Sequence, residues 1–290
     1  MNQKANTTSF KEQIDAQVLS GKVARGSDTS LPVILAIHGG TYNCDYFDIP
    51  GYSLIDRAVA QGFDIVALDR PGYRESTALP DTPDMIDANA QALNAALPAL
   101  IAKLGLAGRP IFVIGHSIGG AIALTLASIR AGWSLSGIAV SGVGAETPPE
   151  DADNYANLPQ QYFVELPTPM KDAVMFGPEG SYAADMPQAS HMANTAVPRA
   201  ELIDITGDWQ NRVAGIAARI DVPVHYRQAA HEKLWLTSKE RVAAFADLFT
   251  ASPRVDAALI ENVGHCIDFH NAGAAFQKAQ LDFAAGTQTA

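Results

Sequence analysis

A serine flanked by glycines is the first candidate for chemistry in this chain. Ser117 lies in GHSIG (residues 115–119), where an apolar run ends at Gly115 and a helical pattern begins at the serine. Small residues on both sides of a serine allow a strained turn that exposes its hydroxyl oxygen, and the first N–H groups of the helix face the same point. The pattern predicts that Ser117 is a nucleophile. The alternative is an ordinary serine in a Gly-rich connection.

A nucleophilic serine needs a base, and the chain has seven histidines. His265, in NVGHC, follows the last apolar run, where a loop can return over the end of a sheet. It also comes last in the chain order serine, acid, histidine. We therefore predict that His265 is the general base. The other histidines lie beside the serine, at strand ends, inside a strand, in loops or in a proline-rich segment: His116, His38, His225, His231, His270 and His191.

The acid that orients the base has three candidates. Glu232 falls at the C-terminal end of the apolar run VPVHYRQAA, where a carboxylate can hold the imidazole tautomer and stabilise the imidazolium. Glu146 follows the preceding run and is its rival, and Asp268 is a more distant candidate. A surface residue at a helix start is the other interpretation of Glu232. We predict Glu232 as the acid.

The stretch HGGTYNC supplies a candidate oxyanion hole. Two glycines after a strand allow a backbone N–H group to approach a developing negative charge without obstruction by a side chain. We predict that the N–H groups of Gly40 and Ile118 are the donors, with Thr41 as a substitute. A glycine turn that only ends the strand is the alternative.

Six short apolar runs must position these residues. They are mostly unbroken rather than alternating, as is typical of parallel strands buried on both faces of a sheet. Helical patterns lie between several of them, which predicts a mostly parallel, doubly wound α/β sheet with helices on both faces. The runs span residues 32–40, 64–72, 109–117, 135–144, 222–230 and 255–265.

Local signals place several further elements. Thr82 is a predicted N-cap before Pro83 at the first position of a helix, and Pro98 is expected to kink that helix. Thr237 and Glu240 form a capping-box pattern at the start of another helix. Residues 13–26 are consistent with an antiparallel hairpin at the edge of the sheet.

The alternation of strands and helices stops between about residues 145 and 219. This stretch is rich in proline, methionine and aromatic residues and is too long for a simple loop. We predict a cap of short helices over residues 147–219, inserted into a core formed by residues 1–146 and 220–290. The cap is expected to set the substrate, with Thr41, Met175, Phe176 and Trp209 as predicted substrate-binding residues.

Composition excludes several kinds of partner. The chain has 290 residues, a formal net charge of -11 and only two cysteines. The negative charge disfavours nucleic acid or an anionic membrane as a partner. The N-terminus is polar, and no apolar stretch reaches the roughly 18 residues of a membrane-spanning helix. The cysteines lack the spacing of a metal site. We expect a cytoplasmic protein that acts on a small molecule, with no metal and no organic cofactor; its oligomeric state is not readable from the sequence.

Together the segments HGG, DRPGYRES, GHSIGG, AAHEKLW and NVGHC resemble those of the α/β-hydrolase superfamily, in its cap-bearing serine-hydrolase branch. The resemblance covers nearly the whole chain outside the predicted cap, and it implies the α/β-hydrolase fold and a serine–histidine–acid triad. Three positions depart from the family pattern, and the mildest is Ala229, which replaces the glycine of the G-x-x-D acid motif. Arg74 replaces the second glycine of the D-x-P-G-x-G-x-S segment, and Glu232 replaces the usual aspartate, so the loop or His265 must sit slightly further back.

The residues and the resemblance predict a serine hydrolase. We expect it to cleave a carboxylic ester or lactone of a small to mid-sized, largely apolar substrate through an acyl-enzyme. Haloalkane dehalogenases and epoxide hydrolases of this fold use an aspartate at the elbow, so Ser117 disfavours them. Carbon–carbon bond hydrolases, lyases and cofactor-free perhydrolases share the triad and are the alternative. A ligand receptor with little turnover is a third hypothesis, which the complete set of triad residues disfavours.

Overall fold

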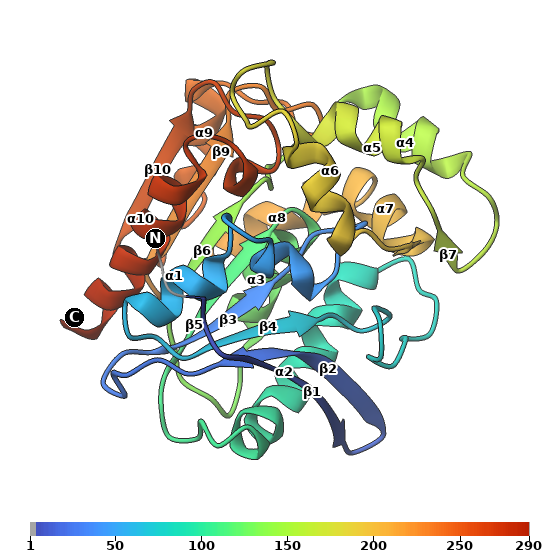
Figure 1. The fold of residues 1–290 in the computed structure, drawn as a ribbon. Coiled ribbons are helices and arrows are strands. Elements are labelled where there is room, and N and C mark those ends of the chain that lie inside the picture. The colour runs from blue at the N-terminus through green and yellow to red at the C-terminus, as the bar shows by residue number, and fades with distance from the viewer. Residues whose placement is uncertain (1–3, 290) are drawn as a thin grey trace.

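An eight-stranded sheet forms the centre of the protein, in the order β1-β2-β4-β3-β5-β6-β9-β10 (Figure 1). The computed structural model describes residues 4–289, so residues 1–3 of the polar N-terminal stretch and Ala290 lie outside it. β1 and β2 form the predicted antiparallel hairpin at one edge, and β2 is also antiparallel to β4. The other neighbouring strands are parallel. The strands are β1 (Thr7–Ile14), β2 (Gln17–Ala24), β3 (Val33–Ile37), β4 (Ile65–Asp69), β5 (Ile111–His116), β6 (Leu135–Ser141), β9 (Val224–Ala229) and β10 (Val255–Ile260).

All six apolar runs are strands of this sheet, as predicted. The central strand β3 shows why these runs are unbroken. Val33, Leu35 and Ile37 pack on one face of the sheet with α2 (Met85–Lys103) and α3 (Ile118–Ile129). Ile34 and Ala36 pack on the other face with α1 (Leu54–Ala60) and α10 (Gly273–Ala285). Every position of the strand is therefore buried, and the predicted doubly wound fold class is confirmed.

Two predicted helix starts are wrong by one or two residues. α2 begins at Met85 after Asp84, because the Thr82 hydroxyl only accepts a 3.5 Å hydrogen bond from the Asp84 N–H ahead of the helix. α9 (Lys239–Ala246) is capped by Ser238, whose hydroxyl accepts from the Arg241 N–H, rather than by the neighbouring threonine. α2 continues through Pro98 as one helix. No helix within residues 4–289 is long and apolar enough to cross a membrane.

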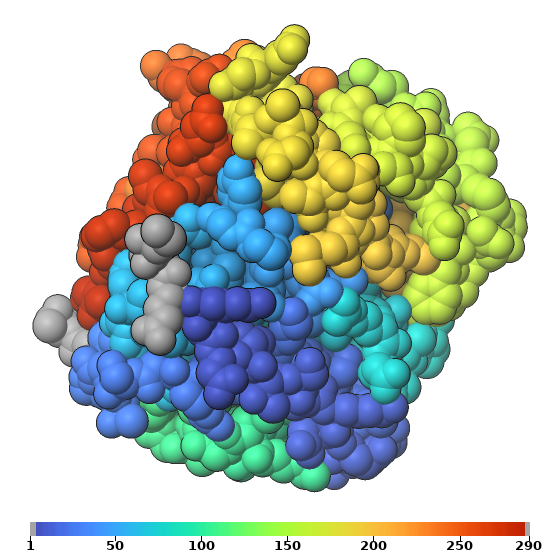
Figure 2. Space-filling model, in the orientation of Figure 1, coloured from blue at the N-terminus to red at the C-terminus, as the bar shows by residue number. Residues whose placement is uncertain are grey.

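Between β6 and β9 the chain forms short helices and one small antiparallel pair of strands. We call residues 147–219 the cap segment, and their division from the core as a domain stays a prediction. Figures 1 and 2 show this segment, coloured yellow-green to gold, covering one end of the molecule. Prolines occupy the first turns of several of these helices, where their missing N–H is not needed. The elements are α4 (Pro149–Ala156), β7 (Phe163–Val164), α5 (Thr168–Met175), α6 (Met186–Ser190), β8 (Val197–Pro198), α7 (Arg199–Thr206) and α8 (Trp209–Ala217).

His225 makes the stability of the sheet sensitive to acid. Its ring lies in β9, 5.4 Å from the ring of Phe283, and neither ring nitrogen has a hydrogen-bond partner among the described residues. Burial, assisted by the positive charge of Arg227, lowers the pKa of His225 from 6.5 to about 4. The unfolded chain therefore binds a proton between pH 6.5 and 4 that the folded protein excludes. We expect this group to remove roughly 3 kcal/mol of stability as the pH falls through that window.

The expected loss can be measured by urea denaturation at several pH values. His225→Leu should make the free energy of unfolding fall less steeply as the pH decreases from 6.5 to 4, because one of the buried histidines that exclude a proton is removed. His231→Leu, at an exposed loop histidine, is the control and should leave the dependence as in the parent protein. Equal slopes for the parent and His225→Leu would show that His225 is not responsible.

Candidate active site

Ser117 lies on a strained turn between β5 and α3. Its backbone has φ 56° and ψ −127°, a conformation that costs a residue with a side chain about 1–3 kcal/mol. The Ser117 N–H donates a 2.8 Å hydrogen bond to the carbonyl oxygen of Ser141 in β6, which fixes the turn against the neighbouring strand. The strand-to-helix context predicted for GHSIG is therefore present, and the strained residue at its centre is the one with the candidate role of nucleophile.

Two glycines allow the turn and the loop after β3 to approach each other. A Cβ atom on Gly39 would lie 2.8 Å from the Cβ atom of Ser117. A Cβ atom on Gly119 would lie 2.3 Å from the carbonyl oxygen of His38. Both distances are too short for any larger residue, so glycine at these two positions brings the loop directly against the serine.

The candidate oxyanion donors lie beside the serine. Gly40 and Ile118 both line the same pocket as Ser117, and a Cβ on Gly40 would be 3.0 Å from Cδ1 of Ile118. Within residues 4–289 the Gly40 N–H donates no hydrogen bond, and Ile118 occupies the first helical position, whose N–H has no partner inside the helix. Thr41, the predicted substitute donor, is the next residue after Gly40 and has a backbone φ angle of 62°. Gly40 and Ile118 therefore lie beside Ser117, and their role as oxyanion donors stays a prediction.

His265 and Glu232 form a buried pair. Nδ1 of His265 is 2.8 Å from Oε2 and 3.0 Å from Oε1 of Glu232, and both side chains are fully buried. The same carboxylate accepts hydrogen bonds from the backbone N–H groups of Lys233 and Leu234, which hold it in place. The ring of His265 lies 4.8 Å from the ring of His116, the residue before the serine. A glutamate therefore reaches the histidine here in spite of its extra methylene group.

The second ring nitrogen of His265 is available. Nε2 is buried and has no hydrogen-bond partner among the described residues, so the structure does not bring the Ser117 hydroxyl within hydrogen-bonding distance of it. Catalytic hydrogen bonds are often long in an unliganded site and tighten when substrate binds. The pairing of Nδ1 with a carboxylate leaves Nε2 as the nitrogen that can accept a proton.

The rival acids have other partners. Glu146 is exposed and forms a 3.0 Å ion pair with Arg241. Asp268 is buried, but its carboxylate accepts from the Tyr46 hydroxyl at 2.8 Å and from the Gln277 side chain at 2.7 Å. Neither touches His265, so the geometry favours Glu232 among the three.

Replacing Glu232 tests this arrangement. We expect Glu232→Gln to reduce kcat for ester hydrolysis roughly 10³–10⁴-fold, because the amide neither stabilises an imidazolium nor fixes the correct tautomer. Steady-state kinetics on a small activated ester would measure the loss. Glu146→Gln is the matched control and should change kcat less than twofold. A larger loss for Glu146→Gln than for Glu232→Gln would reverse the assignment.

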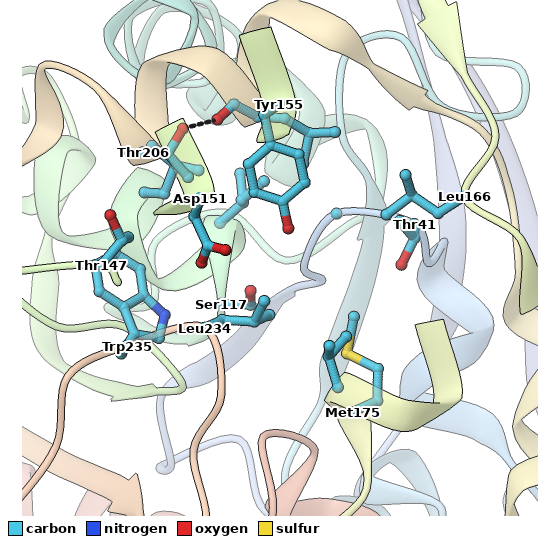
Figure 3. A pocket seen from close by; sticks show the side chains of 15 residues that line it. Thr41, Ser117, Thr147, Asp151, Tyr155, Leu166, Met175, Thr206, Leu234 and Trp235 are labelled. Carbon is cyan, nitrogen blue, oxygen red and sulfur yellow. Dashed lines mark hydrogen bonds between the residues drawn. The ribbon is translucent and has the colours of Figure 1, made fainter. Parts of the chain in front are cut away.

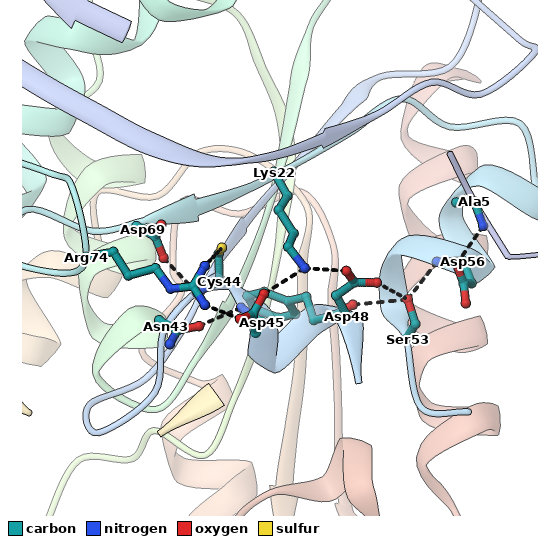
Figure 4. A network of polar contacts seen from close by, with 11 residues as sticks. Ala5, Lys22, Asn43, Cys44, Asp45, Asp48, Ser53, Asp56, Asp69 and Arg74 are labelled. Carbon is teal, nitrogen blue, oxygen red and sulfur yellow. Dashed lines mark hydrogen bonds and ion pairs between the residues drawn. The ribbon is translucent and has the colours of Figure 1, made fainter. Parts of the chain in front are cut away.

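A polar network holds the segment that follows the candidate oxyanion loop (Figure 4). This segment is the short 3₁₀ helix η1 (Cys44–Asp48). Its first N–H, on Cys44, donates to Asp69 at 2.9 Å, and Asp45 forms ion pairs with Lys22 at 2.7 Å and with Arg74. Arg74, which replaces a family glycine, adopts φ 47°, a conformation that glycine adopts more readily. Its guanidinium group forms the ion pair at this strained position, so the replacement adds a contact that glycine lacks.

Arg70 connects the loop to the cap segment. Its side chain is fully buried and donates to the carbonyl oxygen of His38 at 2.9 Å and to that of Gly39 at 3.2 Å. It also pairs with Glu201 of α7 at 2.6 and 3.0 Å, and that carboxylate accepts from the Tyr73 hydroxyl at 2.8 Å. The conformation of the loop beside Ser117 is therefore coupled to a carboxylate from the cap segment.

A pocket with about 530 Å³ of empty space, including its open mouth, lies over Ser117 (Figure 3). Its walls come from the loop after β3, the elbow, the cap segment and the loop after β9. Most of the surface is apolar, as is usual for a small-molecule site. The lining residues are Gly40, Thr41, Ser117, Ile118, Thr147, Asp151, Tyr155, Leu166, Val174, Met175, Leu202, Ile205, Thr206, Leu234 and Trp235.

Two of the four predicted substrate-binding residues line this pocket, namely Thr41 and Met175. The prediction was wrong for Phe176 and Trp209. Phe176 packs against Tyr182, with ring centres 4.9 Å apart. Trp209 is completely buried and donates from its indole nitrogen to the carbonyl oxygen of Gly144 at 2.8 Å. The ring of Phe176 also lies 6.4 Å from that of Phe269 in the core, so both aromatic side chains attach the cap segment to the core, and neither lines the pocket.

Comparison with known proteins agrees with this architecture. The chain belongs to the alpha/beta hydrolase family, whose sequence profile matches residues 33–277. No curated protein sequence matches the chain. The predicted family resemblance is confirmed.

Similar solved structures include enzymes of different chemistry. A thermophilic esterase from Thermogutta terrifontis has a TM-score of 0.68 at 17% identity, covering 97% of this chain and 99% of that one. The esterase EaEST from Exiguobacterium antarcticum has a TM-score of 0.69 at 16% identity, covering 95% and 98%. A loop variant of the haloalkane dehalogenase DbeA from Bradyrhizobium elkanii has a TM-score of 0.66 at 16% identity, covering 98% and 99%. Likeness at this level of identity establishes the fold, and the reaction must be argued from the site.

Proposed function

We propose that the protein is a serine hydrolase that cleaves a carboxylic ester or lactone of a small to mid-sized, largely apolar molecule. The observation that carries the proposal is the buried pair of His265 and Glu232 beside the strained turn at Ser117. This combination of a nucleophile on an elbow, an imidazole and an orienting carboxylate is the arrangement that acyl transfer requires. The apolar pocket over the serine supports an apolar substrate.

In the proposed reaction, Nε2 of His265 removes the proton of the Ser117 hydroxyl as its oxygen attacks the ester carbonyl carbon. Glu232 stabilises the imidazolium that forms. The N–H groups of Gly40 and Ile118 bind the oxyanion of the tetrahedral intermediate. His265 then gives its proton to the leaving alcohol, which yields the acyl-enzyme. A water molecule, deprotonated by the same histidine, attacks the acyl carbon, and His265 returns this proton to the Ser117 oxygen as the carboxylic acid is released.

The proposed nucleophile is a serine. Haloalkane dehalogenases of this fold use an aspartate at the elbow, so Ser117 disfavours dehalogenation as the reaction. Carbon–carbon bond hydrolysis, lyase and perhydrolase reactions use the same triad and are the second candidate. Turnover of a dienic diketone or release of cyanide from a hydroxynitrile, with simple esters left intact, would favour that group. We also propose a cytoplasmic location, which the two free buried thiols of Cys44 and Cys266 support.

Labelling with a fluorophosphonate probe tests the proposal directly. We expect mass spectrometry to locate the probe on Ser117, and the protein to hydrolyse members of a panel of esters and lactones of graded size. If the folded protein reacts with neither the probe nor p-nitrophenyl acetate, Ser117 is not an activated nucleophile. Labelling of Ser117 without ester or lactone turnover would move the function to the second candidate.

A further inference from the structure

The pocket over Ser117 contains one charged side chain that the proposed reaction does not use. Asp151 and Tyr155 are four residues apart in α4, which places them on the same face of that helix. Both line the pocket, and Figure 3 shows the Asp151 carboxylate and the Tyr155 hydroxyl pointing from α4 toward the level of the serine. Of the described residues that line this pocket, Asp151 alone is charged.

The carboxylate of Asp151 lacks a full set of partners. Its Oδ2 atom is buried and accepts no hydrogen bond in the part of the chain that the structure describes. Burial and then the nearby charge of Glu150 raise the pKa of Asp151, while a hydrogen bond from the Asn154 side chain opposes them. A buried oxygen without a donor is costly, so the free protein holds a carboxylate that a positive ligand would stabilise.

A purely structural role does not account for this position. An acidic residue in the first turn of a helix interacts favourably with the helix dipole. Glu150 lies in the same first turn and is exposed, so it provides that interaction in water. Asp151 lines a largely apolar pocket instead, and Glu150 interacts with the helix dipole without it.

We propose, on the basis of the proposed hydrolase function, that the pocket binds the protonated amine of an ester or lactone substrate through Asp151 and the ring of Tyr155. A carboxylate forms a strong hydrogen bond with an ammonium group, and an aromatic face attracts the same cation. A neutral hydroxyl would gain only the first of these. The overall charge of -11 also raises the local concentration of cationic substrates. Asp151 is thus a specificity-determining residue.

A pair of esters with the same shape tests the proposal. p-Nitrophenyl 6-(dimethylamino)hexanoate has a protonated tertiary amine near neutral pH and forms no lactam. p-Nitrophenyl 7-methyloctanoate has the same outline and no charge. We expect the parent protein to have the higher kcat/KM for the amine. Asp151→Asn should lower the ratio of the two kcat/KM values roughly 10- to 100-fold, as expected for loss of a hydrogen bond to a charged group.

Four further variants separate the possible results. Glu150→Gln removes a charge from the same turn of α4 and should leave the ratio unchanged. Asp151→Glu keeps the charge and should retain most of the preference for the amine. Tyr155→Leu should lower the ratio further than Tyr155→Phe, because phenylalanine keeps the aromatic face.

The outcomes also separate this proposal from the proposed function. If the parent protein hydrolyses the neutral ester and shows no preference for the amine ester, the amine site is wrong and the proposed serine hydrolase function stands. Equal losses on both esters in Asp151→Asn also overturn it. No turnover of either ester, with Ser117 unlabelled by the fluorophosphonate, overturns the hydrolase function and the amine site together.

Discussion

Replacing Ser117 by alanine is expected to lower kcat for ester hydrolysis by roughly 10⁴–10⁶-fold, and His265→Ala should cause a loss of similar size. The two effects should not add, because the nucleophile and its base act in the same step. Activity that remains would come from the pocket and the N–H groups of the oxyanion site. Stopped-flow or steady-state assays of the single and double variants would measure these losses.

The substitution should change chemistry and leave folding intact. Alanine in place of Ser117 removes one oxygen and keeps the backbone hydrogen bond to Ser141. Ser128→Ala, near the end of α3 and outside the pocket lining, is the control and should keep full activity. If Ser117→Ala hydrolyses esters at the parent rate, the serine is not the nucleophile.

Replacing Glu201 by alanine is expected to cause a large loss of stability. Arg70 and Glu201 are both fully buried, and removal of the carboxylate leaves a guanidinium group without its counter-charge. Breaking a buried ion pair in this way costs about 3–5 kcal/mol. The Tyr73 hydroxyl loses its acceptor at the same time. Urea denaturation at neutral pH would measure the change in the free energy of unfolding.

An exposed ion pair gives the matched comparison. Glu146 and Arg241 are 45–52% exposed, so Glu146→Ala should cost less than about 1 kcal/mol. Arg70→Met combined with Glu201→Met should recover part of the loss seen in Glu201→Ala, because it removes both buried charges. A Glu201→Ala protein as stable as Glu146→Ala would contradict the assignment of Arg70 and Glu201 as a tightly coupled pair.

The fold could be predicted because its signals are local. Each strand of the parallel part is a short apolar run bounded by glycine or polar residues. Because parallel strands run in the same direction, their C-terminal ends lie at the same end of the sheet. Ser117 and Glu232 follow two of these strands, and His265 lies just after a third. Their positions in the sequence were enough to predict that they lie near one another. The first residues of the helices could not be predicted exactly. Thr82 and Ser238 each have a nearby residue that is an equally suitable N-cap, and only the side-chain hydrogen bonds in the structure show where the helix begins.

The pocket could not be predicted in the same way. Its lining comes from segments far apart in the chain, and an aromatic side chain in the cap segment can face either the pocket or the core. Trp209 was predicted to bind substrate, but the partner of its indole N–H is the Gly144 carbonyl oxygen in the core. Asp151 and Tyr155 had a visible signal in their spacing of four. That spacing predicts a shared helix face, and only the packing of α4 shows what the face contacts.

Arg70 restricts how this protein can exchange its cap with a relative. The guanidinium group belongs to the core and holds the carbonyl oxygens of the loop beside the serine, yet its counter-charge, Glu201, arrives on a helix of the inserted segment. A chimera that received a foreign insertion without a carboxylate at this point would leave the arginine buried and unpaired. Recombination between relatives should therefore succeed only when the insertion and the core inherit this pair together.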